Sequence, residues 1–391
     1  MAIRPIWFVL AAFVTAASSN SRGSEINDTS PNQSLADVSA TAFSAGKTQW
    51  RVEGSPAFDA CCLINTLTGD PYYLKYYQAE FDKWSQRLSP DCRAALARLR
   101  SQKEKNGEIL SAQLTLYFSA VNVASLADIL AALRAPERIK QALQITSYYS
   151  EDGWTQFIAQ RDDLIRVFED LRAKHFEDDW QETVLPKVAK RREELRTKLP
   201  RYDIISMQES LLGFQLSSHE VTIYLLYYSE PHGIKIVGTR FITHVGYPDK
   251  IVLKNAIHEM MHPPYRLDTD PELKKSLEQL RESSFLNEKI RNHNPSFGYN
   301  SFEGFIEEDC VQALEQIISE DLGLATEAHE RWQKSDDGMH VLAVVLYQLM
   351  RREHFSEHPG NGFRGFLVDQ TRTGNLSDDN LKKLDEGYRI K

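Results

Sequence analysis

The chain has 391 residues, of which 42% are hydrophobic and 26% are charged. That composition is typical of a globular protein with enough apolar material for a core, and the length fits two or three domains. The formal net charge is −9. Because nucleic-acid binding needs a surplus of Lys and Arg on one face, this charge excludes nucleic acid as the main partner.

The N-terminus has the order of parts found in a secretory signal peptide. A positive charge at Arg4 precedes an apolar run over residues 6–17, and small residues follow at positions 16–19. A membrane-spanning helix needs about 20 apolar residues, so the run is short for an uncleaved anchor. We therefore expect a signal peptide over residues 1–19, a secreted or periplasmic protein, and no stable membrane insertion after cleavage.

Two regions of different character follow the predicted signal. Residues 20–46 are rich in Ser, Asn, Asp and Thr and predict a flexible lead-in. Residues 47–213 predict a helical N-terminal region, because apolar residues recur at the spacing of a buried helix face. This spacing runs through residues 73–88, 92–99, 109–133, 154–171 and 204–212. In an exported protein, we expect Cys92 to form a disulfide with Cys61 or Cys62.

The pattern changes near residue 217, where short strands are expected. Three runs rich in β-branched and aromatic residues, at positions 221–228, 234–237 and 239–245, predict strands. The last of these is a candidate for holding an extended peptide by strand addition.

A helix over residues 250–262 is expected directly after the strands. Asp249 is its predicted N-cap, and Pro263-Pro264 ends it. Further helices are expected at about 271–291, 301–321, 338–353 and 376–388. The sequence thus predicts an α+β fold that is mainly α-helical, with a small sheet beside the 250–262 helix.

The 250–262 helix carries the motif H-E-x-x-H at His258, Glu259 and His262. Residues four apart lie on one face of a helix, so both imidazoles can point at one ion. Zinc lowers the pKa of a bound water toward about 7, and the adjacent Glu259 is placed to take its proton as general base. The apolar residues before His258 indicate a buried helix, in which unpaired polar groups are costly. The alternative is two core histidines satisfied by ordinary hydrogen bonds.

A catalytic zinc usually has three protein ligands, so a third is expected downstream. The predicted helix over residues 302–314 is dense in carboxylates. Glu303 begins a Glu-Gly-Phe segment similar to the ligand segment of zinc aminopeptidases. Glu307 shares a helical face with apolar residues, so periodicity favours its burial, and Glu308 is the third candidate. The alternative for this whole helix is a solvated acidic face.

A family resemblance adds to this pattern. The order of strands, an H-E-x-x-H helix and a Glu-bearing helix resembles the gluzincin metallopeptidases. Residues 257–264 and 302–314 are most similar to a group of secreted bacterial H-E-x-x-H proteins. That group has an aromatic residue about six positions before a segment that reads Asn or Glu, then Glu-x-hydrophobic-Val-Arg-Ala. The matching positions here are Phe302, Glu307-Glu308, Val311, Gln312 and Ala313, with Gln312 in place of Arg. The resemblance covers about residues 220–370 and implies Glu308 as third zinc ligand. We therefore expect a zincin-like metallopeptidase region over residues 214–391.

Asp268 is a rival third ligand. It occupies the last position of the metzincin spacing H-E-x-x-H-x-x-G-x-x-H/D. The turn glycine of that pattern is replaced by Tyr265, however, and two prolines stiffen the approach. A sharp reversal of the chain after the helix is therefore disfavoured.

The donor that would stabilise an oxyanion is left open by the sequence. Candidates are Tyr265, His340, Tyr347 and Arg351. The function that the motifs favour is a secreted zinc-dependent metallohydrolase, a peptidase acting on a peptide or protein substrate. One alternative is a secreted binding or scaffold protein that retains a zinc site without turnover. Another is a helical protein without metal, in which the motif is accidental.

Overall fold

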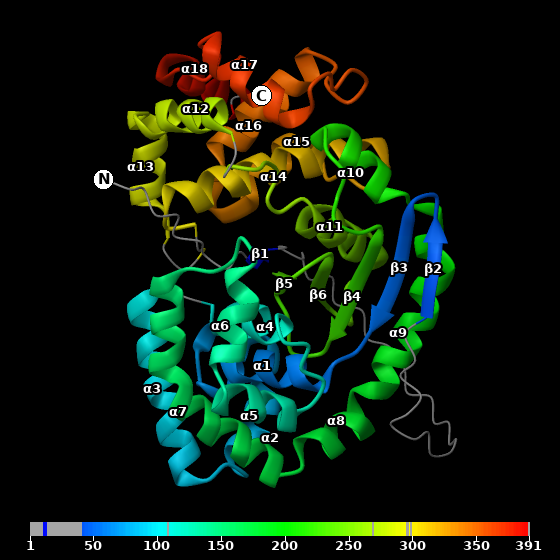
Figure 1. The fold of residues 1–391 in the computed structure, drawn as a ribbon, viewed down its shortest axis with the longest axis vertical. Coiled ribbons are helices and arrows are strands. Elements are labelled where there is room, and N and C mark those ends of the chain that lie inside the picture. The colour runs from blue at the N-terminus through cyan, green and yellow to red at the C-terminus, as the bar shows by residue number, and fades with distance from the viewer. Residues whose placement is uncertain are drawn as a thin grey trace.

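The computed structural model describes residues 11–13, 41–107, 109–267, 270–294, 297 and 299–389. It confirms a mainly helical α+β fold with a small mixed sheet. In Figure 1 the sheet lies in the middle of the molecule, with α1–α8 at one end and α12–α18 at the other. Among the described residues, no helix combines the length and the apolarity needed to cross a bilayer.

The expected helical region begins with a strand and continues in helices. Proline at the first turn and a side-chain cap define several helix starts, as at Ser55, whose hydroxyl accepts a hydrogen bond from the Phe58 amide. The helices are α1 (Pro56–Leu67), α2 (Pro71–Ser85), α3 (Pro90–Asn106), α4 (Leu110–Ser119), α5 (Leu126–Arg134), α6 (Glu137–Gln144), α7 (Glu151–Ala173), α8 (Phe176–Thr183), α9 (Leu185–Lys198), the 3-10 turn η2 (Leu199–Arg201) and α10 (Ile204–Leu212).

The sheet draws strands from distant parts of the chain. Its strands are β1 (Ala11–Phe13), β2 (Thr41–Ala45), β3 (Thr48–Glu53), β4 (Glu220–Leu226), β5 (His232–Ile236) and β6 (Arg240–His244), in the order β1-β5-β6-β4-β3-β2. β4 pairs in parallel with β3 and with β6, and the other neighbours are antiparallel. The three expected strands are confirmed. β3 begins the predicted N-terminal region and β4 lies in the predicted C-terminal region, so one sheet joins the two.

Several expectations for the N-terminal part change. The lead-in expected over residues 20–46 is wrong for Thr41–Ala45, which form β2 because they pair with β3. Residues 14–40 and 1–10 lie outside the described residues, so most of the predicted signal does too, and only Ala11–Phe13 are seen, as β1. The expected disulfide is absent. Cys61, Cys62 and Cys92 are buried free thiols, the first two on α1 and the third on α3.

The C-terminal half is helical after the sheet. Its elements are α11 (Asp249–Met260), α12 (Pro271–Arg281), α13 (Ser284–Asn292), α14 (Phe302–Asp321), α15 (Ala328–Lys334), η4 (Ser335–Gly338), α16 (Val341–Arg352), α17 (Gly362–Arg372) and α18 (Asp378–Arg389). The helix expected over 271–291 is divided because Ser283 caps a new helix through the Leu286 amide. No helix was expected at α15 or α17.

The helix that carries the H-E-x-x-H motif differs slightly from its prediction. It ends at Met260, two positions before His262, ahead of Pro263-Pro264. Asp249 is its first residue and not its N-cap. The Asp249 carboxylate instead accepts from Lys198 Nζ at 2.6 Å and pairs with Arg191 at 2.8 Å, so two cations of α9 compete for it.

The sheet separates two helical layers. Neighbouring residues of a strand point to opposite faces, and β5 shows both. His232 Nε2 lies 2.9 Å from the Tyr73 hydroxyl of α2. The Cβ position of Gly233 faces Asn255 of α11. The α11 helix therefore lies on one face of the sheet, and α14 packs against α11 on its far side.

Candidate metal centre

The α11 helix is buried, as its sequence predicts. His258, Glu259 and His262 are 5%, 1% and 6% exposed. The helix is fixed from the side by Gln208 of α10, whose Nε2 donates to the Ile257 carbonyl at 2.7 Å. Position and orientation of the two imidazoles are thus set by packing on the sheet and by a hydrogen bond from a separate helix.

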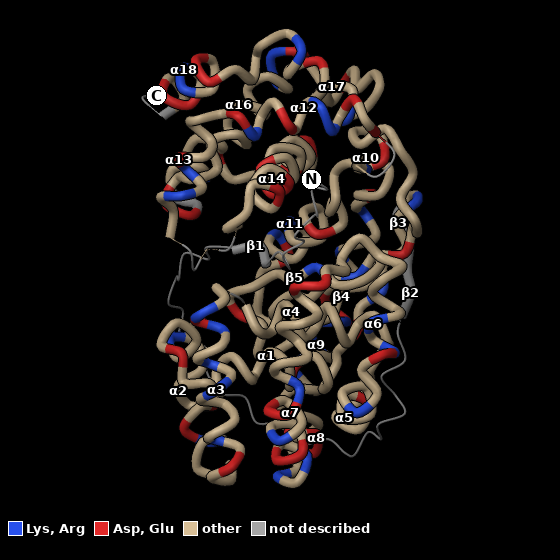
Figure 2. Tube along the Cα trace, turned by 60° about the vertical axis from the view of Figure 1, so that its left-hand side comes forward, with Lys and Arg blue, Asp and Glu red and all other residues tan. Residues whose placement is uncertain are grey.

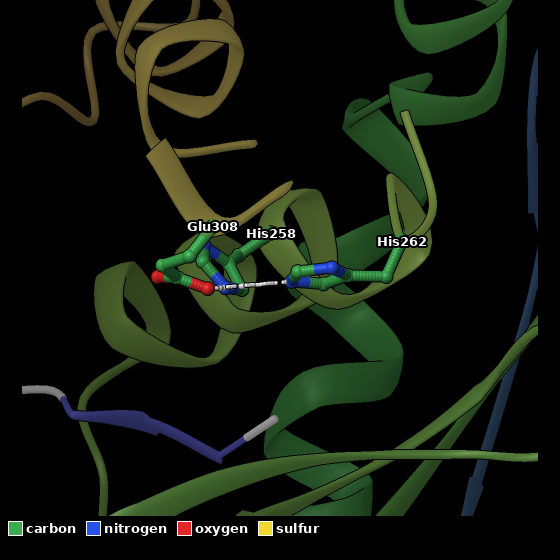
Figure 3. A group of neighbouring side chains, drawn as sticks. All are labelled: His258, His262 and Glu308. Atoms are coloured by element: carbon green, nitrogen blue, oxygen red, sulfur yellow. Dashed lines mark hydrogen bonds and ion pairs between the residues drawn. The ribbon is translucent and has the colours of Figure 1, made fainter. Parts of the chain in front are cut away.

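His258, His262 and Glu308 converge, as Figure 3 shows. The two Nε2 atoms lie 3.2 Å apart, and Glu308 Oε2 lies 3.5 Å from that of His258 and 3.6 Å from that of His262. A tetrahedral zinc site with bonds of about 2.0–2.2 Å has ligand–ligand edges of about 3.3–3.6 Å. The triangle therefore has the dimensions of three ligands around one ion.

The outer nitrogen of each imidazole faces a carboxylate. His262 Nδ1 donates to Glu307 Oε1 at 3.0 Å, and His258 Nδ1 lies 3.8 Å from Glu315 Oε2. Arg331 and Lys254 also pair with Glu315. The hydrogen bond to Glu307 favours the His262 tautomer that leaves Nε2 free for a metal and orients the ring, while Glu315 lies near the same nitrogen of His258 beyond hydrogen-bond distance.

Glu308 is itself held by a neighbour. Gln312 Nε2 donates to Glu308 Oε1 at 2.9 Å, and Trp332 Nε1 donates to Gln312 Oε1 at 3.1 Å. Glu308 Oε2 faces the two imidazoles, and no described residue donates a hydrogen bond to this buried atom. Gln312 occupies the position where the similar group of H-E-x-x-H proteins has Arg. Here its uncharged amide holds the Glu308 carboxylate by a hydrogen bond.

The other third-ligand candidates lie elsewhere. Glu303 forms an ion pair with Arg281 near the surface, and Glu307 contacts the outer nitrogen of His262. Asp268 lies outside the described residues. The alternative of a solvated acidic helix is wrong, because the carboxylates of α14 from Glu307 to Glu315 are buried. Figure 2 shows acidic residues along α14 in the interior of the molecule.

Glu259 lies between α11 and the sheet. Both of its carboxylate oxygens are buried and have no hydrogen-bond donor among the described residues. A Cβ atom at Gly233 would lie 3.3 Å from Glu259 Oε1 and 3.0 Å from Asn255 Nδ2. Glycine at position 233 therefore lets β5 approach the carboxylate closely. Burying a carboxylate without a hydrogen-bond partner costs free energy, unless another group interacts with it.

Burial and charge shift the pKa values of these groups in different directions. Burial acts to lower the pKa of His258, but the nearby Glu308 outweighs it and raises the pKa to about 10. Burial acts to raise the pKa of Glu308, but His258 lowers it to about 2. Burial raises the pKa of Glu259, although His258, His262 and Lys235 partly oppose this. Without metal, the protein therefore holds a His258–Glu308 ion pair.

The expected oxyanion donors are mostly engaged. Both nitrogens of His340 contact carboxylates. The Tyr347 hydroxyl donates to Glu320 at 2.6 Å, and Arg351 also pairs with Glu320. Tyr265 is buried, and burial and the nearby Cys310 and Glu307 raise its pKa.

Two tyrosines near the centre were missed by the sequence analysis. Burial and the charges of Glu307 and Glu259 raise the pKa of Tyr148, which follows α6 and is half-buried. Burial, charge and a hydrogen bond to Glu308 raise the pKa of Tyr299. Neither lies in a motif, so nothing in the sequence marked them. Tyr148 brings a residue of the N-terminal helical region toward the centre.

Comparisons of the chain with protein-family models, with curated proteins and with solved structures gave no match. The function is therefore inferred from the chemistry of the site.

Proposed function

We propose that this protein is a zinc-dependent hydrolase, specifically a secreted or periplasmic peptidase with a zincin-like core. The observation that carries the proposal is the convergence of His258 Nε2, His262 Nε2 and Glu308 Oε2 within one buried triangle. Two imidazoles and one carboxylate are a donor set that catalytic zinc sites use, with the remaining position open.

The surroundings of the triangle fit a metal cation. Among the described residues, both oxygens of Glu259 are buried without hydrogen-bond donors, and Glu308 Oε2 is met only by the two imidazoles, at 3.5 and 3.6 Å. Unmet acceptors of this kind at one place favour a bound cation and its associated water. The carboxylates at the outer nitrogens of His258 and His262 match the second layer of zinc sites. Zinc, when bound, would polarise a substrate carbonyl and make water acidic.

Glu259 is the group placed to move a proton. It follows His258 directly, and its carboxylate has no other partner among the described residues. Burial raises its pKa, which makes the carboxylate a stronger base than an exposed glutamate. We assign Glu259 the role of general base, and Tyr148 is the candidate donor to a developing oxyanion.

A peptide substrate is supported by the strand pairing beside Glu259. The expectation that residues 239–245 offer a free edge is wrong, because β6 pairs on both sides, with β5 and β4. The strand next to α11 is β5, which is also paired on both sides, with β6 and with β1, and β1 lies within the predicted signal peptide. β1 pairs with it in antiparallel register, with Ala12 opposite Gly233. An extended backbone therefore fits beside β5, next to the glycine that approaches Glu259, and we propose that a substrate takes the place of β1 once the signal peptide is removed.

The proposal is tested by digesting a broad peptide library with the purified full chain. We expect cleavage that is lost on chelation and restored by zinc. The Glu259→Gln variant should bind zinc normally but lose about 10²–10⁴-fold in rate, the contribution of a general base. Zinc binding without any cleavage would favour the alternative of a scaffold protein. Cleavage that survives Glu259→Gln would contradict the assigned mechanism.

A further inference from the structure

His340 lies at the centre of a buried network that the catalytic assignment does not use. Its Nδ1 lies 2.6 Å from Asp309 Oδ1, and its Nε2 lies 2.9 Å from Asp336 Oδ2. The imidazole is 1% exposed. Because a carboxylate only accepts hydrogen bonds, both ring nitrogens carry protons. The imidazole is therefore a cation held between two carboxylates, and it has no free nitrogen for a substrate or a metal.

Asp309 connects this network to the candidate metal ligand. It follows Glu308 directly on α14, and its side chain is fully buried. One carboxylate oxygen contacts His340, and the other accepts from the Ala343 amide of α16 at 3.0 Å. With both oxygens engaged, Asp309 fixes the rotation of α14 at the turn from which Glu308 projects.

The imidazole of His340 also supports two aromatic rings near Glu308. Tyr299 packs edge-on against it at 5.5 Å between ring centroids, and Phe305 stacks on it at 6.4 Å. The Tyr299 side chain is hydrogen-bonded to Glu308. His340 thus contacts Tyr299, which is hydrogen-bonded to Glu308, and Asp309, which follows Glu308 in the sequence.

The backbone around His340 is strained. Asp336 and Asp337 have φ values of 45° and 53°, and Tyr299 has 57°. Non-glycine residues rarely adopt this region, and such strain persists only where the surroundings fix it. Two of the three strained residues, Asp336 and Tyr299, contact the His340 ring directly.

We propose that His340 is a positioning residue of the metal centre, acting through Asp309 and Tyr299 to hold the Glu308 carboxylate toward His258 and His262. The inference rests on the proposed function, because it assumes that Glu308 is a zinc ligand. His340 would touch neither zinc nor substrate. Its effect would be to reduce the rearrangement that Glu308 needs when the ion binds.

The test is the zinc dissociation constant of the full chain, measured by competition with a chromophoric chelator. The variants are Asp336→Ala, which removes an acceptor, and Asp336→Asn, which retains one through its amide oxygen. His340→Gln serves as a third variant should Asp336→Ala fail to fold. The control is Asp59→Asn. Asp59 is fully buried, as Asp309 is, and accepts from Trp180 and two backbone amides on the other side of the sheet, so we expect its substitution to destabilise the chain without touching α14.

We expect Asp336→Ala and His340→Gln to weaken zinc binding about 10–100-fold, as outer groups of zinc sites do, with Asp336→Asn retaining most of the affinity. Asp59→Asn should bind zinc like the unsubstituted chain. The inference is overturned if folded Asp336→Ala and His340→Gln bind zinc normally. It is also overturned if Asp59→Asn loses zinc affinity in proportion to the fall in its melting temperature, because the losses in the other variants would then reflect general destabilisation. If the unsubstituted chain binds no zinc, the proposed function itself fails.

Discussion

Glu307 Oε1 accepts a hydrogen bond of 3.0 Å from His262 Nδ1. Its neighbour Glu308 reaches the opposite nitrogen of the same imidazole, with Oε2 3.6 Å from Nε2. Adjacent glutamates on α14 thus contact the two sides of one ring. The arrangement gives them different roles, because a metal would bind at the Nε2 side while Glu307 orients the ring from behind.

The different roles of the glutamates predict graded effects on zinc binding. Glu308→Gln should weaken zinc binding by more than about 100-fold, because it removes a proposed ligand, and Glu307→Gln by about 10–100-fold. Glu303→Gln is the matched control, since Glu303 pairs with Arg281 and should leave the affinity unchanged. The measurement is a chelator competition for each full-length variant. Equal losses for Glu303→Gln and Glu308→Gln would contradict the assignment.

Zinc affinity should depend on pH through His258. A ligand imidazole must be neutral, but the Glu308 charge raises the pKa of His258 to about 10 in the metal-free protein. Binding at neutral pH therefore releases this proton, and the affinity should rise about tenfold per pH unit up to that pKa. An ordinary histidine would give a plateau above about pH 7. Dissociation constants between pH 6 and 9 that level off by pH 7 would contradict the ion pair.

The same ion pair should shape the stability of the metal-free chain. The folded pKa of His258 is raised above that of an unfolded histidine, so its contribution is full below about pH 6.5 and is lost as the pH rises toward 10. The pKa of Glu308 is lowered to about 2, so its contribution is full above about pH 4.5 and is lost as the pH falls through 2. In urea unfolding, His258→Gln should flatten the fall of stability on the alkaline side. An unchanged pH profile would contradict the pair.

Zinc should stabilise the folded chain. An ion that binds only the native state adds about 2.7 kcal/mol to the unfolding free energy at a free concentration one hundred times its dissociation constant. Urea unfolding with and without zinc measures this increment. The increment should disappear in His262→Ala and persist in Glu303→Gln. An increment retained in His262→Ala would indicate that zinc binds elsewhere.

Tyr148 should affect the chemical step. Its hydroxyl has no hydrogen bond to any described residue and lies close enough to Glu259 and Glu307 for their charges to raise its pKa. Tyr148 comes three positions after Ile145, which follows α6 and is 90% exposed. If it stabilises an oxyanion, Tyr148→Phe should lower kcat about 10²-fold with zinc affinity unchanged. Tyr149→Phe is the neighbouring control, because the Tyr149 hydroxyl donates to Glu151. A normal kcat for Tyr148→Phe would exclude the role.

Sequence patterns predicted the parts of the site that follow local rules. The four-residue spacing brought His258 and His262 onto one face, and the resemblance indicated Glu308, which the structure brings to them. Periodicity favoured Glu307, and it was right about burial. It could not separate two adjacent buried glutamates, because their distinction depends on which side of the His262 ring each reaches. The side of the ring that each glutamate reaches is set by the tertiary structure.

Other parts could not be predicted, since they depend on contacts between distant segments. Glu315 reaches His258 only because α14 packs against α11. β3 and β2 contain few strand signals and are fixed by pairing with β4 and with each other. His340 was one of four candidates for the oxyanion donor. Two carboxylates from α14 and η4 occupy it instead.

The central claim is that His258, His262 and Glu308 hold one zinc ion beside Glu259. Anomalous diffraction at the zinc absorption edge from crystals of the zinc-loaded full chain tests it most directly. The account predicts a single strong peak bonded to Nε2 of both histidines and to Oε2 of Glu308, with the Glu259 carboxylate outside bonding distance. No peak at this position, or a peak bonded to Glu303 or Glu307 in place of Glu308, would contradict it.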